Sequence, residues 1–259
     1  MKAVILAGGL GTRLSEETNL KPKPMVEIGG KPILWHIMKF YSDYGINDFI
    51  ICAGYKSEYI KNYFSNFFQS NSDIKIDLKN NKLEILSKQK NDWTVSIVDT
   101  GRNTMTGGRL KRVQKYIGKE DFCFTYGDGL TNINLRKIIK FHKKNKSVAT
   151  LTAVQTPERF GRLNINNKNG IVEKFMEKPK KTNEWINGGF FILSKEIFKF
   201  IKNDSSIFER ETLEKLSKKK LLSAYKHKGF WYAMEKLSDK IYLEDLWKKN
   251  KAPWRIVGG

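Results

Sequence analysis

Short apolar runs alternate with amphipathic stripes along the first two thirds of the 259-residue sequence. The runs Ala3–Leu6 and Asp48–Ala53 are typical of buried strands, while the stretch from Pro32 and the stretch 59–67 repeat apolar residues at helical spacing. This alternation predicts βαβ units and therefore an α/β fold with a mostly parallel sheet flanked by helices. A sheet of that kind binds its ligand beyond the carboxyl ends of its strands.

Further strands are expected along the chain. They cover residues 94–98, 121–125 and 148–154, with a helix over 133–141 before the last of them. After Pro157 the strands become shorter and are separated by polar turns, which predicts a smaller β-rich excursion on the substrate side over 160–165, 171–175 and 189–193. The tail predicts a strand pair, 222–225 with 230–234, and then a helix with Leu237, Ile241, Leu246 and Trp247 facing inward.

Composition excludes several classes of protein. No apolar run approaches the roughly 18 to 20 residues that a bilayer span requires, and the N-terminal apolar stretch is better explained as a first strand than as a signal peptide. Cys52 and Cys123 both lie in apolar runs, so we expect buried thiols and a cytoplasmic chain without disulfides. The three histidines are far apart in sequence and give no support to a zinc site.

The sequence is strongly basic, with 48 Lys+Arg against 27 Asp+Glu and a formal net charge of +21. Such a charge is compatible with nucleic acid, an anionic surface or an anionic substrate as the partner. The lysines occur in short clusters rather than in one stripe, which favours solvated faces. Nucleic-acid binding therefore remains an alternative without a motif to support it.

A glycine-rich loop follows the first strand directly. Its sequence is Leu6-Ala7-Gly8-Gly9-Leu10-Gly11-Thr12-Arg13. Glycines at this point let backbone N–H groups approach phosphate oxygens, which suits a triphosphate. The pattern matches neither the dinucleotide fingerprint nor the P-loop.

Two prolines surround Lys23 shortly after this loop, in Lys21-Pro22-Lys23-Pro24. Because proline stiffens the backbone, Lys23 can be presented to a phosphate at little cost in ordering.

Together these two motifs resemble sugar-phosphate nucleotidylyltransferases. Further motifs narrow the resemblance to the glucose-1-phosphate cytidylyltransferase branch and extend it over residues 1 to about 254. They are Asp99-Thr100-Gly101, residues 104–110, Tyr126-Gly127-Asp128-Gly129, Glu177-Lys178-Pro179, and residues 185–191, 227–231 and 251–254.

The resemblance implies a Rossmann-like fold of the nucleotide-diphospho-sugar transferase type and a defined reaction. CTP and α-D-glucose 1-phosphate would give CDP-glucose and pyrophosphate, for the dideoxysugars of bacterial surface polysaccharide. The length of the chain predicts a single domain over 1–259, in which we expect 1–155 to form the nucleotide-binding core and 156–259 the sugar-phosphate-binding and C-terminal part. Family members assemble as homo-oligomers, so we expect one here, and neither a nucleic acid nor a membrane as partner.

Roles for individual residues follow from the same resemblance. The loop residues Leu6, Ala7, Gly8, Gly9, Gly11, Thr12 and Arg13 would hold the CTP base and phosphates, with Lys23 near the α-phosphate. Thr104 and Arg109 would hold the cytidine end, and Gly127 would lie in the site beside Asp128. Lys178 would grip the sugar phosphate, while Glu177 and Asn187, next to Gly188, would bond sugar hydroxyls.

The expected chemistry is a direct in-line displacement at the α-phosphorus, with Arg13 and Lys23 as the catalytic cations. Both reactants are anions, so charge neutralisation by Arg13, Lys23, Lys178 and Mg²⁺ would supply most of the catalysis. No covalent intermediate is needed.

Two carboxylates are the candidate Mg²⁺ ligands. Asp128 follows a strand end, and Glu235 stands in Met234-Glu235-Lys236-Leu237-Ser238-Asp239, where the family usually has Met-Asp-Thr-Leu-Arg-Asp. Glutamate keeps the charge but reaches one methylene further. The departure bears on the acceptor and motivates one alternative, a CTP-binding regulator without catalytic activity. A second alternative keeps the chemistry and takes another phosphorylated acceptor or another pyrimidine nucleotide.

Overall fold

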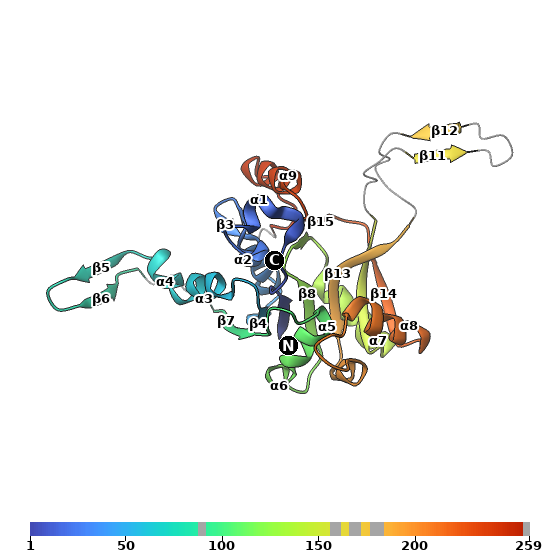
Figure 1. Cartoon of the computed structure of the whole chain (residues 1–259), viewed down its shortest axis with the longest axis horizontal. Coiled ribbons are helices and arrows are strands. Elements are labelled where there is room, and N and C mark those ends of the chain that lie inside the picture. Colours follow the sequence, from blue (N-terminus) through green and yellow to red (C-terminus); the bar gives the residue numbers. More distant parts are fainter. Residues whose placement is uncertain (88–91, 156–161, 166–171, 177–183, 256–259) are drawn as a thin grey trace.

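The computed structural model describes residues 1–87, 92–155, 162–165, 172–176 and 184–255. Its centre is a seven-stranded sheet with the order β14-β10-β13-β8-β1-β4-β7 (Figure 1). The strands are β1 (Ala3–Leu6), β4 (Asp48–Ala53), β7 (Thr94–Asp99), β8 (Phe122–Tyr126), β10 (Ala149–Val154), β13 (Ile186–Leu193) and β14 (Leu222–His227). Only β13 runs antiparallel to its neighbours in this sheet, so the prediction of a mostly parallel sheet is confirmed.

Four small antiparallel pairs accompany the sheet. They are β2 (Glu27–Ile28) with β3 (Lys31–Pro32), β5 (Ile74–Asp77) with β6 (Lys82–Ile85), β9 (Gly129–Thr131) with β15 (Trp231–Ala233), and β11 (Arg162–Ile165) with β12 (Val172–Met176). The β5–β6 hairpin projects away from the body of the molecule at one end (Figure 1).

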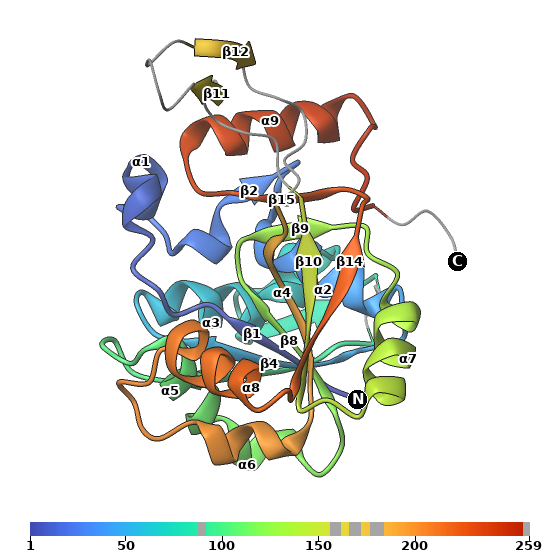
Figure 2. The ribbon, with the colours of Figure 1, turned by 90° about the vertical axis from the view of Figure 1, so that its right-hand side faces the viewer.

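Helices cover the sheet and its ends (Figure 2). The α-helices are α1 (Ser15–Thr18), α2 (Ile33–Ser42), α3 (Ser57–Ser65), α4 (Phe67–Ser70), α5 (Thr106–Arg112), α6 (Gln114–Ile117), α7 (Leu135–Asn145), α8 (Glu214–Lys218) and α9 (Leu237–Lys248). The described residues also include three 3-10 helices, η1 (Thr12–Leu14), η2 (Lys23–Met25) and η3 (Lys195–Phe200), and a π-helix, η4 (Phe208–Leu213).

Two hydrophobic clusters lie on the two faces of the sheet. Because successive side chains of a strand point to opposite faces, Ala3 and Ile5 of β1 enter one cluster and Val4 and Leu6 enter the other. Helix α2 contributes its expected apolar face to the first cluster, and α5 packs into the second through Leu110. The sheet therefore holds its carboxyl edge rigidly for the residues that follow each strand.

The structure corrects three expectations about the last third of the chain. The tail strands do not pair with each other, since β14 joins the main sheet beside β10 and β15 pairs with β9. The segment expected at 189–193 belongs to the main sheet as β13 rather than to an excursion. In α9, Leu237 and Ile241 are 37% and 61% exposed, so they do not face the core as predicted.

Cys52 and Cys123 are buried and unpaired, as expected. His36 and His142 are buried as well, and take part in packing. Within the described ranges, none of the helices combines the length and the apolar character that crossing a membrane requires.

Candidate active site

The glycine-rich loop leaves the carboxyl end of β1 and is fastened to the end of β4. The Ala7 backbone N–H donates to the Cys52 carbonyl at 2.9 Å, and Tyr55 N–H donates to the Gly8 carbonyl at 3.3 Å. A Cβ on Gly8 would lie 2.3 Å from Nη1 of Arg109, whereas a Cβ on Gly9 would meet nothing within 4 Å. Gly8 is therefore required by close packing, and Gly9 leaves the loop backbone open on its outer side.

The loop closes onto η1 and α1. Gly11 has a φ of +68°, and a Cβ there would lie 2.8 Å from the Cγ2 atom of Thr18. Leu14 N–H donates to the Gly11 carbonyl at 3.0 Å, and the Thr18 hydroxyl donates to the Leu14 carbonyl at 2.8 Å. Thr12 and Arg13 thus begin a tight helical turn directly beside the loop.

Arg109 lies beneath this loop with only 5% of its surface exposed. Its Nη1 donates to the Thr100 hydroxyl at 2.8 Å and to the Gly101 carbonyl at 2.7 Å, and its Nη2 donates to the Arg102 carbonyl at 3.1 Å. The guanidinium therefore braces the segment after β7 against Gly8. The direct contact of Arg109 with a nucleotide remains a prediction.

Thr104, the other residue expected at the cytidine end, lies just before α5 and is 7% exposed. A Cβ on Gly101 would lie 2.9 Å from the Thr104 hydroxyl oxygen, so Thr104 packs against the same segment that Arg109 braces. Gly107 and Gly108 in α5 allow this helix to pack closely against the segment around Asp204. A Cβ on Gly108 would lie 2.4 Å from the Asp204 carbonyl oxygen.

Lys23 and Asp128 meet at the carboxyl ends of β1 and β8. The Lys23 ammonium contacts Oδ2 of Asp128 directly, and the two side chains are 12% and 29% exposed. A Cβ on Gly127 would lie 2.6 Å from the Leu6 carbonyl oxygen and 3.0 Å from Cγ of Pro24. Three motifs that are far apart in sequence therefore converge at one edge of the sheet.

The second candidate metal carboxylate, Glu235, is brought to the same edge by strand pairing. In the β9–β15 pair Gly129 lies opposite Ala233, and Met234 N–H donates to the Asp128 carbonyl at 2.9 Å. Glu235 follows directly.

Asp239 orders the backbone around Glu235, and sequence reasoning missed it. Its Oδ2 accepts from the N–H groups of Glu235 at 2.8 Å and Lys236 at 3.0 Å, and its Oδ1 accepts from the Tyr232 hydroxyl at 3.1 Å. It is only 2% exposed, which is rare for a carboxylate and is explained by these three donors. Asp239 could have been predicted from its position three residues after Lys236 at the start of α9, because this is the spacing of a helix-capping pair.

The donor set suits a hard divalent cation. Magnesium is usually held by one or two carboxylates and completes its shell with water and substrate phosphates. Asp128 and Glu235 on adjacent backbone segments fit that requirement. Among the described residues, no group of three or more His, Cys, Asp or Glu side chains is arranged to hold a metal ion without such help.

The candidate sugar-binding residues Asn187 and Gly188 lie at the start of β13, at the same end of the sheet. Gly189 N–H donates to Oδ1 of Asn187 at 2.9 Å, and the Trp231 indole donates to the Gly188 carbonyl at 2.6 Å. A Cβ on Gly188 would lie 2.9 Å from Cγ1 of Val154, so the position is crowded. Glu177 and Lys178 lie outside the described residues.

Glu209 in the π-helix η4 is a second residue that sequence reasoning missed. It accepts a hydrogen bond from the Tyr126 hydroxyl and another from the Thr106 hydroxyl at 2.8 Å. Burial, and then the negative charge of Glu209, raise the pKa of Tyr126 well above its usual range. Glu209 thus ties the end of β8 to the start of α5, across 83 residues of sequence that carry no local signal of the contact.

Comparisons with known proteins give matches over nearly the whole chain. A family model described as nucleotidyl transferase matches residues 2–239, a range that runs from β1 to Asp239. The chain is 54% identical to the glucose-1-phosphate cytidylyltransferase of Salmonella typhimurium, over 98% of this chain and 99% of that protein. It is 41% identical to a probable glucose-1-phosphate cytidylyltransferase of Bacillus subtilis, over 99% of this chain and 100% of that one.

Solved structures give the same fold. HddC from Yersinia pseudotuberculosis in complex with GMP-PN has a TM-score of 0.67 and 28% identity, covering 95% of this chain and 99% of that one. A UDP-glucose pyrophosphorylase in complex with UDP-glucose has a TM-score of 0.67 at 19% identity, over 96% of this chain and 98% of that one, which supports the fold alone.

Proposed function

The chain belongs to the nucleotidyl transferase family, and from that premise we propose that it is an enzyme that joins CTP and α-D-glucose 1-phosphate to give CDP-glucose and pyrophosphate. The observation that carries the proposal is the convergence of the glycine loop, Lys23 and Asp128 at the carboxyl ends of β1 and β8. A loop for phosphates, a cation and a carboxylate are the groups that nucleotidyl transfer requires.

The residues act by positioning and by neutralising charge. The sugar phosphate is already an anionic nucleophile near pH 7, so the main obstacle is its repulsion by the triphosphate. The Lys23 ammonium, held by Asp128, supplies positive charge where phosphate oxygens arrive, and Arg13 on η1 adds to it. Such contacts in a site with restricted water contribute several kcal/mol to the transition state. Pyrophosphate leaves toward the Gly8–Arg13 loop in this proposal.

Nucleotidyl transferases generally use a divalent metal ion, and Mg²⁺ is the ion proposed here. Asp128 and Glu235 would hold it. Bound there, the ion would offset the charge of the phosphates.

The remaining roles follow the family pattern. Thr104 and Arg109 support the cytidine end, with Arg109 acting through the backbone it braces. Asn187, beside Gly188, would bond sugar hydroxyls, and the same family pattern assigns sugar hydroxyls to Glu177 and the sugar phosphate to Lys178. All of them belong to a single working domain.

The enzyme is proposed to work as a homo-oligomer. Six apolar side chains of the β5–β6 hairpin and its flank are between 37% and 84% exposed, namely Ile74, Ile76, Leu78, Leu83, Ile85 and Leu86. Contiguous exposed apolar surface of this kind typically marks a contact with another chain. The buried free thiols Cys52 and Cys123 and the nucleotide substrate support a cytoplasmic location.

A substrate panel tests the proposal. Pyrophosphate release is measured with CTP, UTP, dTTP, ATP and GTP against glucose 1-phosphate in Mg²⁺, with Asp128→Asn as the control. Release with CTP that is lost in the control supports the proposal. Pyrophosphate release with another nucleotide would assign that nucleotide as the donor, and release with another sugar phosphate would assign that sugar phosphate as the acceptor.

Two further outcomes would replace the proposal. CTP binding without release under any condition would identify a regulator. Salt-dependent binding of duplex or single strands without turnover would identify a nucleic-acid-binding protein.

A further inference from the structure

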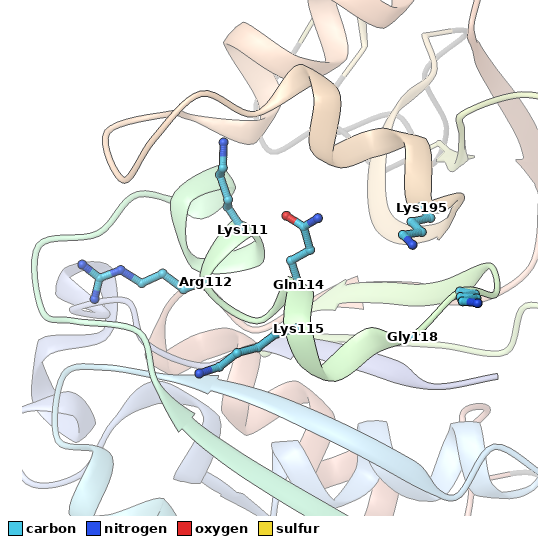
Figure 3. A pocket seen from close by; sticks show the side chains of 7 residues that line it. Lys111, Arg112, Gln114, Lys115, Gly118 and Lys195 are labelled. Atoms are coloured by element: carbon cyan, nitrogen blue, oxygen red, sulfur yellow. The ribbon is translucent and has the colours of Figure 1, made fainter.

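A basic pocket lies away from the candidate active site. It has a volume of about 530 Å³ and is lined by Lys111, Arg112, Gln114, Lys115, Gly118, Lys119 and Lys195. This lining includes five cationic side chains and no carboxylate. In Figure 3, Lys111 and Gln114 rise from the α5–α6 side, and Lys195 faces them from the segment above.

The pocket opens at the opposite end of the sheet from Asp128. Lys119 precedes β8 and Lys195 follows β13, and the register pairs Leu193 with Phe122 at the amino end of β8. Asp128 follows the carboxyl end of the same strand. Figure 2 shows α6 at one end of the molecule and the β9–β15 pair toward the other.

Two of the cations form a fixed wall. Lys111 donates to the carbonyls of Ile201 at 2.6 Å and Lys202 at 2.8 Å. Arg112 makes a two-pronged contact with Asp204, at 2.9 Å through Nε and 2.6 Å through Nη2. These bonds join α5 to the segment that leads from η3 toward η4, and so they hold the pocket open.

Lys115, Lys119 and Lys195 also line the pocket, and the Lys115 ammonium lies 5.1 Å from the centroid of the Tyr116 ring. Lys115, Lys119 and Lys195 form no ion pair with a carboxylate in the described part of the chain. Three acidic side chains from the same segments are engaged elsewhere, since Asp204 binds Arg112, Glu196 pairs with Lys199, and Glu120 pairs with the N-terminal amine. Three ammonium groups that line one open pocket attract an anion that carries several charges.

We propose that this pocket binds a polyphosphate chain, and that its occupancy is coupled to the nucleotide site through α5. The volume lies within the usual range for small-molecule sites, and the lining is cationic rather than apolar, which favours phosphate over a neutral ligand. The phosphate chain can belong to a free inorganic polyphosphate or to a nucleotide.

Helix α5 provides a short physical link. Its seven residues span roughly 10 Å at the usual helical rise. Thr106 at its start bonds Glu209, which also holds Tyr126 at the end of β8. Arg109 at its middle lies under Gly8, and Arg112 at its end lines the pocket. A ligand that moves or stiffens this helix changes the backbone that supports the glycine loop.

Binding is tested by calorimetry with inorganic tripolyphosphate in metal-free buffer at physiological ionic strength, with CDP-glucose held at saturation to fill the nucleotide and sugar sites without supplying a free polyphosphate chain. The expected result is one further tripolyphosphate site per chain. The variant Lys115→Gln/Lys119→Gln/Lys195→Gln should weaken it at least tenfold. The matched control Lys137→Gln/Lys140→Gln/Lys144→Gln, which removes three exposed charges from α7, should change it less than twofold.

No saturable binding, or an equal loss in the two triple variants, overturns the site. Repeating the titration with ATP separates the sources of the phosphate chain, because a nucleotide ligand binds at least threefold more tightly than tripolyphosphate alone. Thermal unfolding of each variant checks that the fold is retained.

Coupling is tested by the dissociation constant of CTP with and without saturating tripolyphosphate. Tripolyphosphate should change this dissociation constant at least threefold more in the wild type and in the α7 control variant than in the Lys115/Lys119/Lys195 variant. In the latter variant, tripolyphosphate can act only by competing with CTP at the nucleotide site. By linkage, CTP must change the affinity for tripolyphosphate by the same factor. Equal changes in all three proteins overturn the coupling. This readout does not depend on turnover, so it stands apart from a failure of the proposed reaction.

Discussion

Lys23 and Asp128, which are 105 residues apart in the sequence, are joined by a direct ion pair at the carboxyl edge of the sheet. Both side chains are largely shielded from water. An ammonium group has three donors, so Lys23 can keep its bond to Asp128 while it donates to phosphate oxygens. The pair therefore fixes a cation at the proposed nucleotide site.

Lys23→Met should lower kcat/KM for CTP by about 10²- to 10³-fold, because it removes a preorganised charge and keeps the side-chain volume. Pyrophosphate release at saturating glucose 1-phosphate measures the effect. Lys21→Met is the matched control, since Lys21 lies in the same motif but pairs with Glu27 at the surface at 3.0 Å. Equal losses in the two variants would show that the motif acts through its general charge and not through Lys23.

Gly8→Ala should weaken CTP binding strongly, while Gly9→Ala should change it little. A methyl group on Gly8 would collide with the Arg109 guanidinium and with Ala53, whereas one on Gly9 would meet no atom within 4 Å. Relieving the collision requires a shift of the loop, and overpacking of this kind costs about 1–3 kcal/mol. Equilibrium binding of CTP and urea unfolding check both expectations. A larger effect at Gly9 would mean that the ligand, rather than Arg109, sets the space around the loop.

Asp239→Asn should raise the Mg²⁺ concentration that gives half-maximal activity by about tenfold, a typical result of losing support behind a metal ligand. The amide carries no charge, so the N–H groups of Glu235 and Lys236 and the Tyr232 hydroxyl lose their charged acceptor, and the backbone before α9 is held less firmly. A magnesium titration of activity measures the shift. Asp245→Asn, which removes only an exposed pair with Lys249, serves as the control. An unchanged magnesium dependence would separate Asp239 from the metal site.

The stability of the protein should fall as the pH drops from 6.5 toward 4, in part through His36. This ring accepts from the Trp254 indole at Nδ1 at 3.4 Å and donates from Nε2 to the Ile28 carbonyl at 2.8 Å, so it is held in the neutral form. Burial lowers the pKa of His36 from 6.5 to about 4, although the negative charge of Glu244 acts in the opposite direction. The unfolded chain therefore binds a proton in this range that the folded chain does not, and stability is lost on acidification.

His36→Gln tests this assignment, because its amide can still donate to Ile28 but does not titrate. Between pH 7 and pH 5 the wild type should lose about 2 kcal/mol more of its unfolding free energy than the variant, at about 1.4 kcal/mol for each pH unit below 6.5. Urea unfolding at the two pH values provides the measurement. His142 and His227 are present in both proteins, so their contributions cancel. Parallel losses would assign the pH dependence to other groups.

Ile76→Ser with Leu78→Ser should reduce the mass of the assembly. These two side chains of the projecting hairpin are 56% and 84% exposed and contribute little to the core of their own chain. Size-exclusion chromatography with light scattering measures the mass. Lys75→Ser with Lys79→Ser on the same hairpin is the control for a change of surface polarity. An assembly of unchanged mass in the first variant would remove the hairpin from the subunit contact.

The amino-acid sequence by itself determined the elements and the chemistry near the N-terminus. The strands Ala3–Leu6 and Asp48–Ala53 and the apolar face of α2 follow from local periodicity, which depends only on residues a few positions apart. The glycine loop and the Lys23 motif are also continuous in sequence, so their character can be recognised without knowledge of the fold.

Only the tertiary structure decided which distant residues meet. Strand β13 enters the main sheet antiparallel, β15 pairs with β9, and Glu209 bonds Tyr126, yet none of these partners is marked by a nearby pattern. Arg109 is a further contact that its local motif did not reveal. The motif suggested a contact with a ligand, whereas in the structure the buried side chain donates its hydrogen bonds to Thr100 and to the backbone that follows it. Local patterns determine the conformation of short segments. Strand pairing and side-chain burial depend on how all the segments pack together, and these contacts exist only in the folded chain.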